Sequence, residues 1–167
     1  MKKIILAMVA VMVPLMLSAG STDFWFRHFS VEDGLSSSAV RAIMQDKYGF
    51  MWLGTDDGLN RYDGTTIKIY RLNPEGVNDY ISFLYDTTDR IWIGTGDGVY
   101  IYDYETENFE PFKLLTAKGD SIKTNVNHIA EDRDGNLWFS TVGQGIFKYN
   151  AVSYTHLRAH ETGRNLV

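Results

Sequence analysis

Three copies of one sequence pattern follow each other along residues 42–150, and this repeat limits the possible folds more than any other feature. Each copy has an aspartate, a tryptophan six residues later inside a short apolar run, and then a glycine and a tyrosine. The tryptophans are Trp52, Trp92 and Trp138, so the pattern recurs after 40 and 46 residues. Short β-prone runs alternate with Gly, Asn and Asp clusters, which are strand and turn signals. A repeat of this length with four strands is typical of a β-propeller blade.

The first copy contains four predicted strands, at 40–45, 50–55, 59–62 and 66–72. A β-solenoid would have shorter repeats, and a β-sandwich would not repeat its own sequence. Residues 20–150 are therefore predicted to have an all-β fold, a partial β-propeller of about three four-stranded antiparallel blades. Propellers close with roughly four to eight blades, so we interpret the chain as an N-terminal fragment of a longer protein.

The repeat positions are predicted to be structural. Tryptophan in mid-strand can bury about 150 to 250 Å² and so fill the gap between two blades. The aspartate that follows a strand can accept hydrogen bonds from backbone amides in a tight turn. A glycine inside a strand is expected to allow close backbone approach beside the indole, and a turn glycine to adopt a positive φ. The positions are Asp46, Trp52, Gly54, Gly58 and Tyr62, then Asp86, Trp92, Gly94, Gly98 and Tyr102, then Asp132, Trp138, Gly145 and Tyr149.

The two ends of the chain lack the repeat. Two lysines precede an uncharged run from Ile4 to Leu17, and Ala19 follows, which predicts a signal peptide over residues 1–19 and an exported chain. A membrane anchor is the alternative, but the run is shorter than the roughly 20 residues that a spanning helix needs. Residues 151–167 carry no repeat position, and 153–162 resemble translated sequencing-adaptor DNA, so we interpret 151–167 as an artefactual tail.

Composition excludes several function classes. The chain has no cysteine, which rules out disulfides, cysteine-based zinc sites and a cysteine nucleophile. The net charge is -5, the wrong sign for binding nucleic acid. The pair His156 and His160 has a metal-ligand spacing without the rest of a zinc motif, and 132–136 reads as a hairpin turn more readily than as a calcium loop. We predict no catalytic residue, metal or cofactor, and the sequence names no ligand-binding residue.

The repeat, with its Asp-Gly, aliphatic-Trp-aliphatic-Gly-Thr and Gly-aliphatic segments, resembles the two-component regulator propeller repeat over residues 24–150. The opening segment 26–37 resembles the start of the periplasmic sensor region of hybrid two-component regulators. In that family an export signal precedes one or two propellers, an immunoglobulin-like domain, a membrane span and a histidine kinase core. Members often control polysaccharide-utilisation genes in glycan-degrading Gram-negative bacteria.

The resemblance implies a periplasmic ligand-sensing segment whose parent is a homodimeric sensor kinase in the inner membrane, with an oligosaccharide as ligand. The remaining blades and the kinase domains of the parent would be its covalent partners. The segment itself is predicted not to be an enzyme. The alternative is an exported propeller hydrolase or lyase acting on glycans, for which the adjacent Asp56 and Asp57 are a poor carboxylate pair because they point in different directions. Tyr80, Tyr100 and Tyr104 could stack on sugar rings, although packing is the commoner role of tyrosine in a strand.

Overall fold

The computed structural model describes residues 25–72, 80–113 and 123–150. This part of the chain contains eleven strands and one short 3-10 helix, η1 (Val31–Asp33). The predicted signal peptide at 1–19 and the tail at 151–167, with His156 and His160, lie outside the described residues. No helix in the three described ranges has the length and apolar character needed to cross a membrane.

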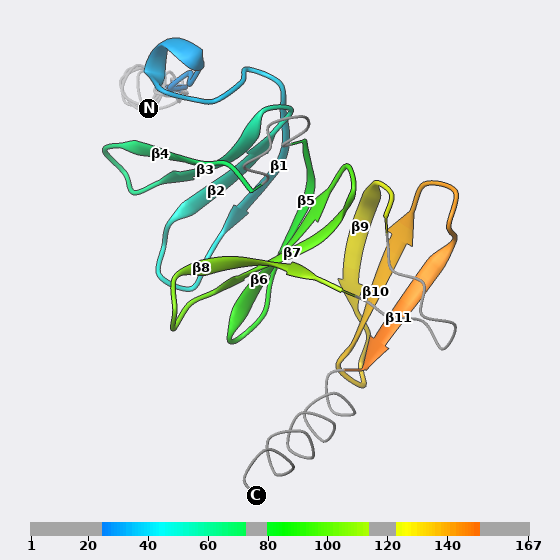
Figure 1. Cartoon of the computed structure of the whole chain (residues 1–167). Coiled ribbons are helices and arrows are strands. Elements are labelled where there is room, and N and C mark those ends of the chain that lie inside the picture. The colour runs from blue at the N-terminus through cyan, green and yellow to red at the C-terminus, as the bar shows by residue number, and fades with distance from the viewer. Residues whose placement is uncertain (1–24, 73–79, 114–122, 151–167) are drawn as a thin grey trace, which may run out of the picture.

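The strands form three separate antiparallel sheets, which follow each other in space as they do in the sequence (Figure 1). We call them blade 1, blade 2 and blade 3. Blade 1 consists of β1 (Val40–Gln45), β2 (Met51–Thr55), β3 (Gly58–Tyr62) and β4 (Ile67–Tyr70). Blade 2 consists of β5 (Ile81–Asp86), β6 (Arg90–Thr95), β7 (Gly98–Asp103) and β8 (Asn108–Phe112). Blade 3 consists of β9 (Val126–Glu131), β10 (Asn136–Thr141) and β11 (Ile146–Asn150).

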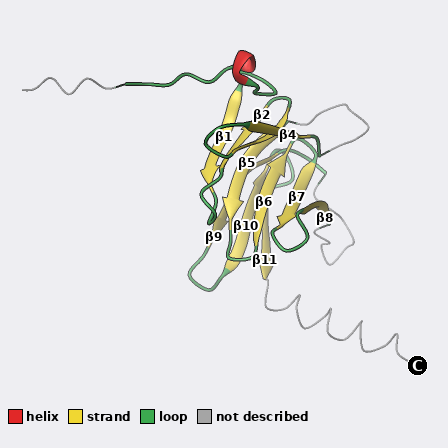
Figure 2. Ribbon diagram, turned by 90° about the vertical axis from the view of Figure 1, so that its left-hand side faces the viewer, coloured by secondary structure: helices red, strands yellow, loops and turns green. Residues whose placement is uncertain are grey.

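Each sheet is a simple meander in which every strand pairs with the next strand in the sequence. The first strands of the blades lie side by side, because β5 packs against both β1 and β9. Figure 2 shows these three strands together on one side of the molecule. The prediction of an all-β fold with antiparallel propeller-type blades is confirmed. Blade 3 has three strands, not four, within the described residues.

Two apolar clusters lie between the blades. The cluster between blades 1 and 2 surrounds Trp52, which is fully buried, and includes Ile81 and Ile91. The cluster between blades 2 and 3 surrounds Trp92 and includes Val126 and Phe139 of the next blade. Each tryptophan thus joins its own blade to the following one. Trp138 has no blade beyond it among the described residues and is 39% exposed.

The glycine inside the second strand of a blade allows close approach by the next blade. A Cβ atom added at Gly54 would lie 2.5 Å from Cγ2 of Ile81, and one at Gly94 would lie 2.9 Å from the carbonyl oxygen of Val126. Ile81 and Val126 both belong to the first strand of the following blade. The close approach that we expected beside the indole is therefore made to the neighbouring blade, because the strands β1, β5 and β9 crowd together.

Candidate functional site

The hairpin between the first and second strands of blade 1 is held by one carboxylate. Asp46 accepts hydrogen bonds from the backbone amides of Tyr48 and Phe50, both at 2.9 Å, and from Nε1 of Trp52 at 2.7 Å. The loop ends on Gly49, whose φ of 90° is in the left-handed region that favours glycine. The aspartate therefore closes the turn and also fixes the indole that fills the blade interface.

Blade 3 repeats this arrangement. Asp132 accepts hydrogen bonds from the backbone amides of Asp134 and Asn136 and from Nε1 of Trp138, the last at 2.8 Å. These donors hold the pKa of the Asp132 carboxyl well below its usual range, with the indole as the largest cause. The segment 132–136 is thus the β9–β10 hairpin turn, in which both carboxylate oxygens are taken by donors of the protein.

Blade 2 departs from the pattern, and the predicted equivalence of Asp86 to the other two aspartates is corrected. Its hairpin is one residue shorter: Trp92 pairs with Tyr85, seven residues earlier, whereas Trp52 pairs with Met44, eight residues earlier. The turn begins at Thr87, whose amide donates to the carbonyl of Arg90, and Asp86 is the last residue of β5. Nε1 of Trp92 is buried and has no hydrogen-bond partner among the described residues.

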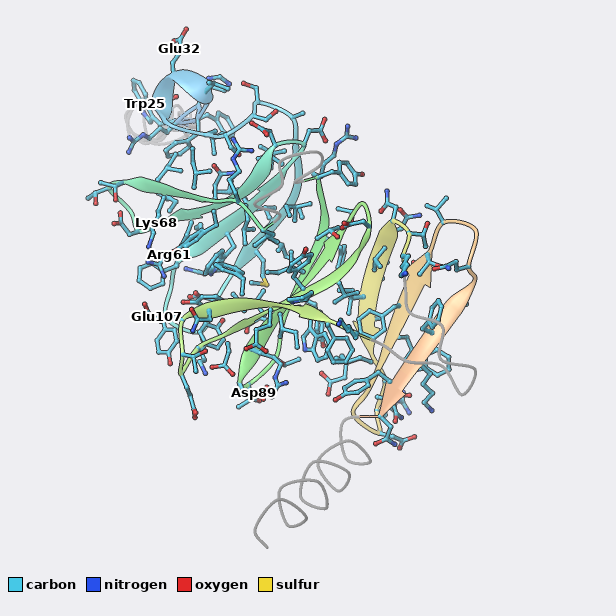
Figure 3. The ribbon with its side chains drawn as sticks, in the orientation of Figure 1. Trp25, Glu32, Arg61, Lys68, Asp89 and Glu107 are labelled. Carbon is cyan, nitrogen blue, oxygen red and sulfur yellow. The ribbon has the colours of Figure 1, made fainter. Side chains whose placement is uncertain are left out.

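The cause of the shorter hairpin can be seen in the sequence. Asp89 stands where the other two copies have a glycine with positive φ, at Gly49 and Gly135. Because an L residue rarely adopts that conformation, the longer loop is unfavourable and the chain turns one residue earlier. Figure 3 shows Asp89 at the tip of this hairpin, where its carboxylate pairs with the adjacent Arg90.

Asp86 instead takes part in a polar contact between blades 1 and 2. It accepts a hydrogen bond of 2.9 Å from the hydroxyl of Tyr104, and burial raises the pKa of its carboxyl. Burial and the neighbouring carboxylate also raise the pKa of the Tyr104 hydroxyl. Nζ of Lys47, in the blade 1 hairpin, lies 4.3 Å from the centre of the Tyr104 ring and donates to the carbonyl of Thr88. These contacts join two hairpins at the same end of neighbouring blades.

The hairpin between β2 and β3 carries the adjacent aspartates that could have suggested a hydrolase. Asp56 forms a bidentate ion pair with Arg41, and Asp57 forms one with Arg71. Each arginine lowers the pKa of its partner carboxyl. The two carboxylates therefore bind different cations and do not form the facing pair that glycoside hydrolysis needs.

The three tyrosines considered for sugar stacking are placed as follows. Tyr100 and Tyr104 pack against the cluster between blades 1 and 2, and Tyr104 also contacts the Tyr48 and Tyr102 rings. Tyr80 lies beside Arg41, whose guanidinium is 5.6 Å from the centre of the ring. Tyr100 and Tyr104 therefore have packing roles, and Tyr80 has a contact with Arg41.

A cavity of about 810 Å³ lies between blades 2 and 3, at the same end as the shortened hairpin. Three aromatic side chains line it: Trp92, Phe112 and Tyr149. Its charged lining consists of Asp89, Asp103, Glu110 and Glu131 with Arg90 and Lys113. Within residues 25–72, 80–113 and 123–150, no three His, Asp or Glu side chains are grouped as metal ligands. The cavity offers apolar contact and hydrogen bonding, and sequence reasoning missed it because its walls come from two different repeats.

Comparison with known proteins agrees with the repeat. The family model described as two component regulator propeller matches residues 34–57 and 121–143. Histidine kinase P4 of Formosa agariphila is 56% identical to this chain over 59 residues, which make up 35% of this chain and 4% of that protein. The chain thus spans a small part of the curated relative that it matches.

Solved structures from B. thetaiotaomicron have the same fold. The extracellular domain of the hybrid two component system BT3049 is 30% identical, with a TM-score of 0.67 over 76% of this chain and 19% of that one. The extracellular domain of BT4673 is 24% identical, with a TM-score of 0.60 over 81% of this chain and 20% of that one, and this likeness concerns the fold alone. The family model and the shared fold thus agree that this chain contains two-component regulator propeller repeats.

Proposed function

We propose that the chain is a periplasmic ligand-sensing propeller segment of a hybrid two-component sensor. The observation that carries this proposal is the 30% identity to the extracellular domain of such a system, which extends over 76% of the chain. The 56% identity to part of a histidine kinase supports the same parent. In this proposal the segment performs no chemistry, and a ligand bound to the completed propeller biases a kinase elsewhere in the same polypeptide.

The ligand is proposed to be an oligosaccharide, and the regulated genes to be those for polysaccharide utilisation. The family resemblance supports this ligand class, and the charge of the segment is compatible with it, because a net charge of -5 disfavours polyanionic ligands such as nucleic acids. The parent would act as a homodimer anchored in the inner membrane, with residues 1–19 as its export signal.

Sequencing the source locus beyond codon 150 tests the proposed parent. A continuous reading frame with further repeats, a membrane span and a histidine kinase core would support it. A stop codon directly after the present tail, or a frame that continues into a hydrolase domain, would contradict it.

The ligand class requires a second experiment. Deleting the codons for residues 25–150 in frame from the parent gene should abolish the transcriptional response of neighbouring genes to an oligosaccharide that induces them. Restoring the deleted codons provides the matched control. An unchanged response in the deletion strain would refute sensing by this segment.

A further inference from the structure

We propose that Arg61 and Lys68, on the side of blade 1 that faces blade 2, form a binding site for the anionic group of an acidic saccharide. The group is a carboxylate or a sulfate ester, both of which present several negatively charged oxygens to a guanidinium. The anion is inferred from the side chains described below, and the saccharide rests on the proposed sensory function. The inference deepens that function by naming the chemical class of the ligand.

The two cations stand directly opposite each other in the sheet. Arg61 of β3 pairs with Lys68 of β4, so the two side chains leave the same face as neighbours. Figure 3 shows both at the outer side of blade 1. Lys68 is exposed and Arg61 is half-buried, so a ligand in solution can reach them. Because like charges that stand opposite destabilise a sheet, this pair favours a negative group beside both cations.

Acidic side chains of the protein do not supply that charge. In the ranges 25–72, 80–113 and 123–150, ion pairs are formed by other cations, namely Arg41, Arg71, Arg90 and Lys148. Figure 3 shows Glu107, in the hairpin between β7 and β8, on the same side of the molecule, but it is not among these pairs. Both carboxylate oxygens of Asp46 accept hydrogen bonds from their own hairpin and from Trp52. The two cations therefore still lack a counter-charge.

The other blades show that the fold does not require cations at these positions. The residue opposite the repeat tryptophan is Arg61 in blade 1, Ile101 in blade 2 and Lys148 in blade 3. In blade 2, Ile101 stands opposite Glu110, so an apolar residue and an acid take the two places. In blade 3, Nζ of Lys148 lies 3.7 Å from the carboxylate of Asp132, which neutralises it. An uncompensated pair of cations is thus particular to blade 1.

Aromatic rings hold the guanidinium of Arg61 in place. Its central carbon lies 4.7 Å from the centre of the Phe50 ring, 5.7 Å from Trp52 and 5.8 Å from Tyr70. Nζ of Lys68 lies 4.8 Å from the centre of the Tyr70 ring. A cation–π contact uses the charge of the guanidinium but none of its N–H donors. An anion would therefore meet a donor group that is already positioned, which lowers the entropic cost of binding.

The overall charge of the chain limits how acidic the ligand can be. A net charge of -5 opposes ligands with many negative charges, so the test uses disaccharides that carry one acidic group or none. Cellobiose, cellobiouronic acid and cellobiose 6′-sulfate differ only at C6 of the non-reducing sugar. That position carries a hydroxyl, a carboxylate or a sulfate ester, so the three probes separate the two possible sources of the anion.

The full chain, labelled with ¹⁵N, is titrated with each disaccharide and followed by nuclear magnetic resonance. The Nε–Hε signal of Arg61 is assigned by its absence from a variant without this arginine. We expect at least one acidic disaccharide to shift this signal and to bind about fivefold or more tightly than cellobiose. Equal binding of all three disaccharides, or no binding, would overturn the proposal. Sodium acetate or sodium sulfate that binds as tightly as the matching disaccharide would show an adventitious ion only, and would refute a saccharide site.

The repeat itself supplies the variant that tests the two cations. Arg61→Ile combined with Lys68→Glu gives blade 1 the pair that blade 2 already has, so the near-ultraviolet circular dichroism of the folded chain should be retained. The preference for the acidic disaccharide should be lost. If this double variant does not fold, Lys68→Gln at an exposed position should still weaken acidic binding by about threefold, whereas Arg133→Gln, an equal change of charge at an exposed turn of blade 3, should not. An unchanged preference in Lys68→Gln and in the double variant would refute the site.

A failure of this site can be told apart from a failure of the proposed function. The double variant is placed in the parent gene and compared with the deletion of codons 25–150. A response to an acidic inducer that the deletion abolishes and the double variant leaves unchanged would refute the site and leave sensing by the segment intact. An unchanged response in the deletion strain would refute sensing, whatever the disaccharide titrations show.

Discussion

The close approach of blade 2 to Gly54 makes a quantitative prediction for the variant Gly54→Ala. The new Cβ atom would lie 2.5 Å from Cγ2 and 2.9 Å from Cβ of Ile81, and 3.3 Å from Cβ of Ala42. Ile81 is fully buried, and its β-branched side chain cannot turn away without displacing its neighbours. Overpacking of this kind destabilises a fold by about 1 to 3 kcal/mol. Replacing glycine by alanine also stabilises the fold by about 0.4 to 1 kcal/mol, because it reduces the conformational entropy of the unfolded chain.

The net loss of about 1 to 2 kcal/mol should lower the melting temperature by about 4 to 8 °C for each kcal/mol. Gly96→Ala is the matched control, because a Cβ atom there would meet the Tyr80 side chain at 3.6 Å, an ordinary contact, and its φ is not in the left-handed region. Thermal unfolding followed by near-ultraviolet circular dichroism compares the two variants. Equal melting temperatures would refute the reasoning.

A double-mutant cycle tests whether Ile81 is the cause. Ile81→Ala by itself should destabilise the chain by about 2 to 5 kcal/mol, because it leaves a cavity in the cluster around Trp52. With Gly54→Ala in the same chain, the new methyl group occupies part of that cavity, so the loss should be smaller than the sum of the two single losses. Strict additivity would show that the strain at Gly54 comes from elsewhere.

Three further predictions concern the repeat residues. Asp46→Ala should lower the free energy of unfolding, measured with urea, by about 1 to 3 kcal/mol, because it leaves Nε1 of the buried Trp52 and two backbone amides without their acceptor. Asp86→Ala should leave its hairpin intact, because Asp86 accepts from the Tyr104 hydroxyl and does not close the turn. Trp138→Ala should cost less than the roughly 3 to 5 kcal/mol expected for Trp52→Ala, since their exposed fractions are 39% and 0%, and equal losses in the same unfolding assay would contradict this. The pKa of the Asp132 carboxyl is lowered in the folded chain, so this carboxylate stabilises the fold above its unfolded pKa of about 4, and the stabilisation is lost as the pH falls below that value. The melting temperature of Asp132→Asn should therefore change less with pH below about 4 than that of the unmodified chain.

The number and order of the blades could be predicted from the sequence because each repeat encodes its own local pairing. Strands are indicated by the alternation of apolar and polar residues, and turns by Gly, Asn and Asp a few positions apart. Both signals are present within a single copy of the repeat. The four strands expected in the first copy are present at Val40–Gln45, Met51–Thr55, Gly58–Tyr62 and Ile67–Tyr70, within a few residues of the expected bounds.

Features that depend on two repeats at once were harder to predict. The neighbour of Gly54 is Ile81, which is distant in the sequence, and no local pattern says which atoms approach a glycine. The shortened hairpin of blade 2 was missed for a different reason. The spacing from Asp86 to Trp92 matches the other copies, and the signal lay in Asp89, which replaces the glycine that the longer turn requires.

The same reasoning extends to the far side of blade 3. Ser140 stands where the other blades have Gly54 and Gly94, and it pairs with His128 as Gly54 pairs with Ala42. Between blades 1 and 2, and again between blades 2 and 3, the glycine has no side chain, so the first strand of the following blade lies close to its backbone. A blade that packs on the Trp138 side must therefore stand farther from β10, or must present a small or polar residue to the serine hydroxyl. In the present chain Ser140→Gly should therefore lower the free energy of unfolding by no more than the roughly 0.5 to 1 kcal/mol that a glycine inside a strand costs. Ser140→Val should weaken attachment of a following blade in a longer version of the protein.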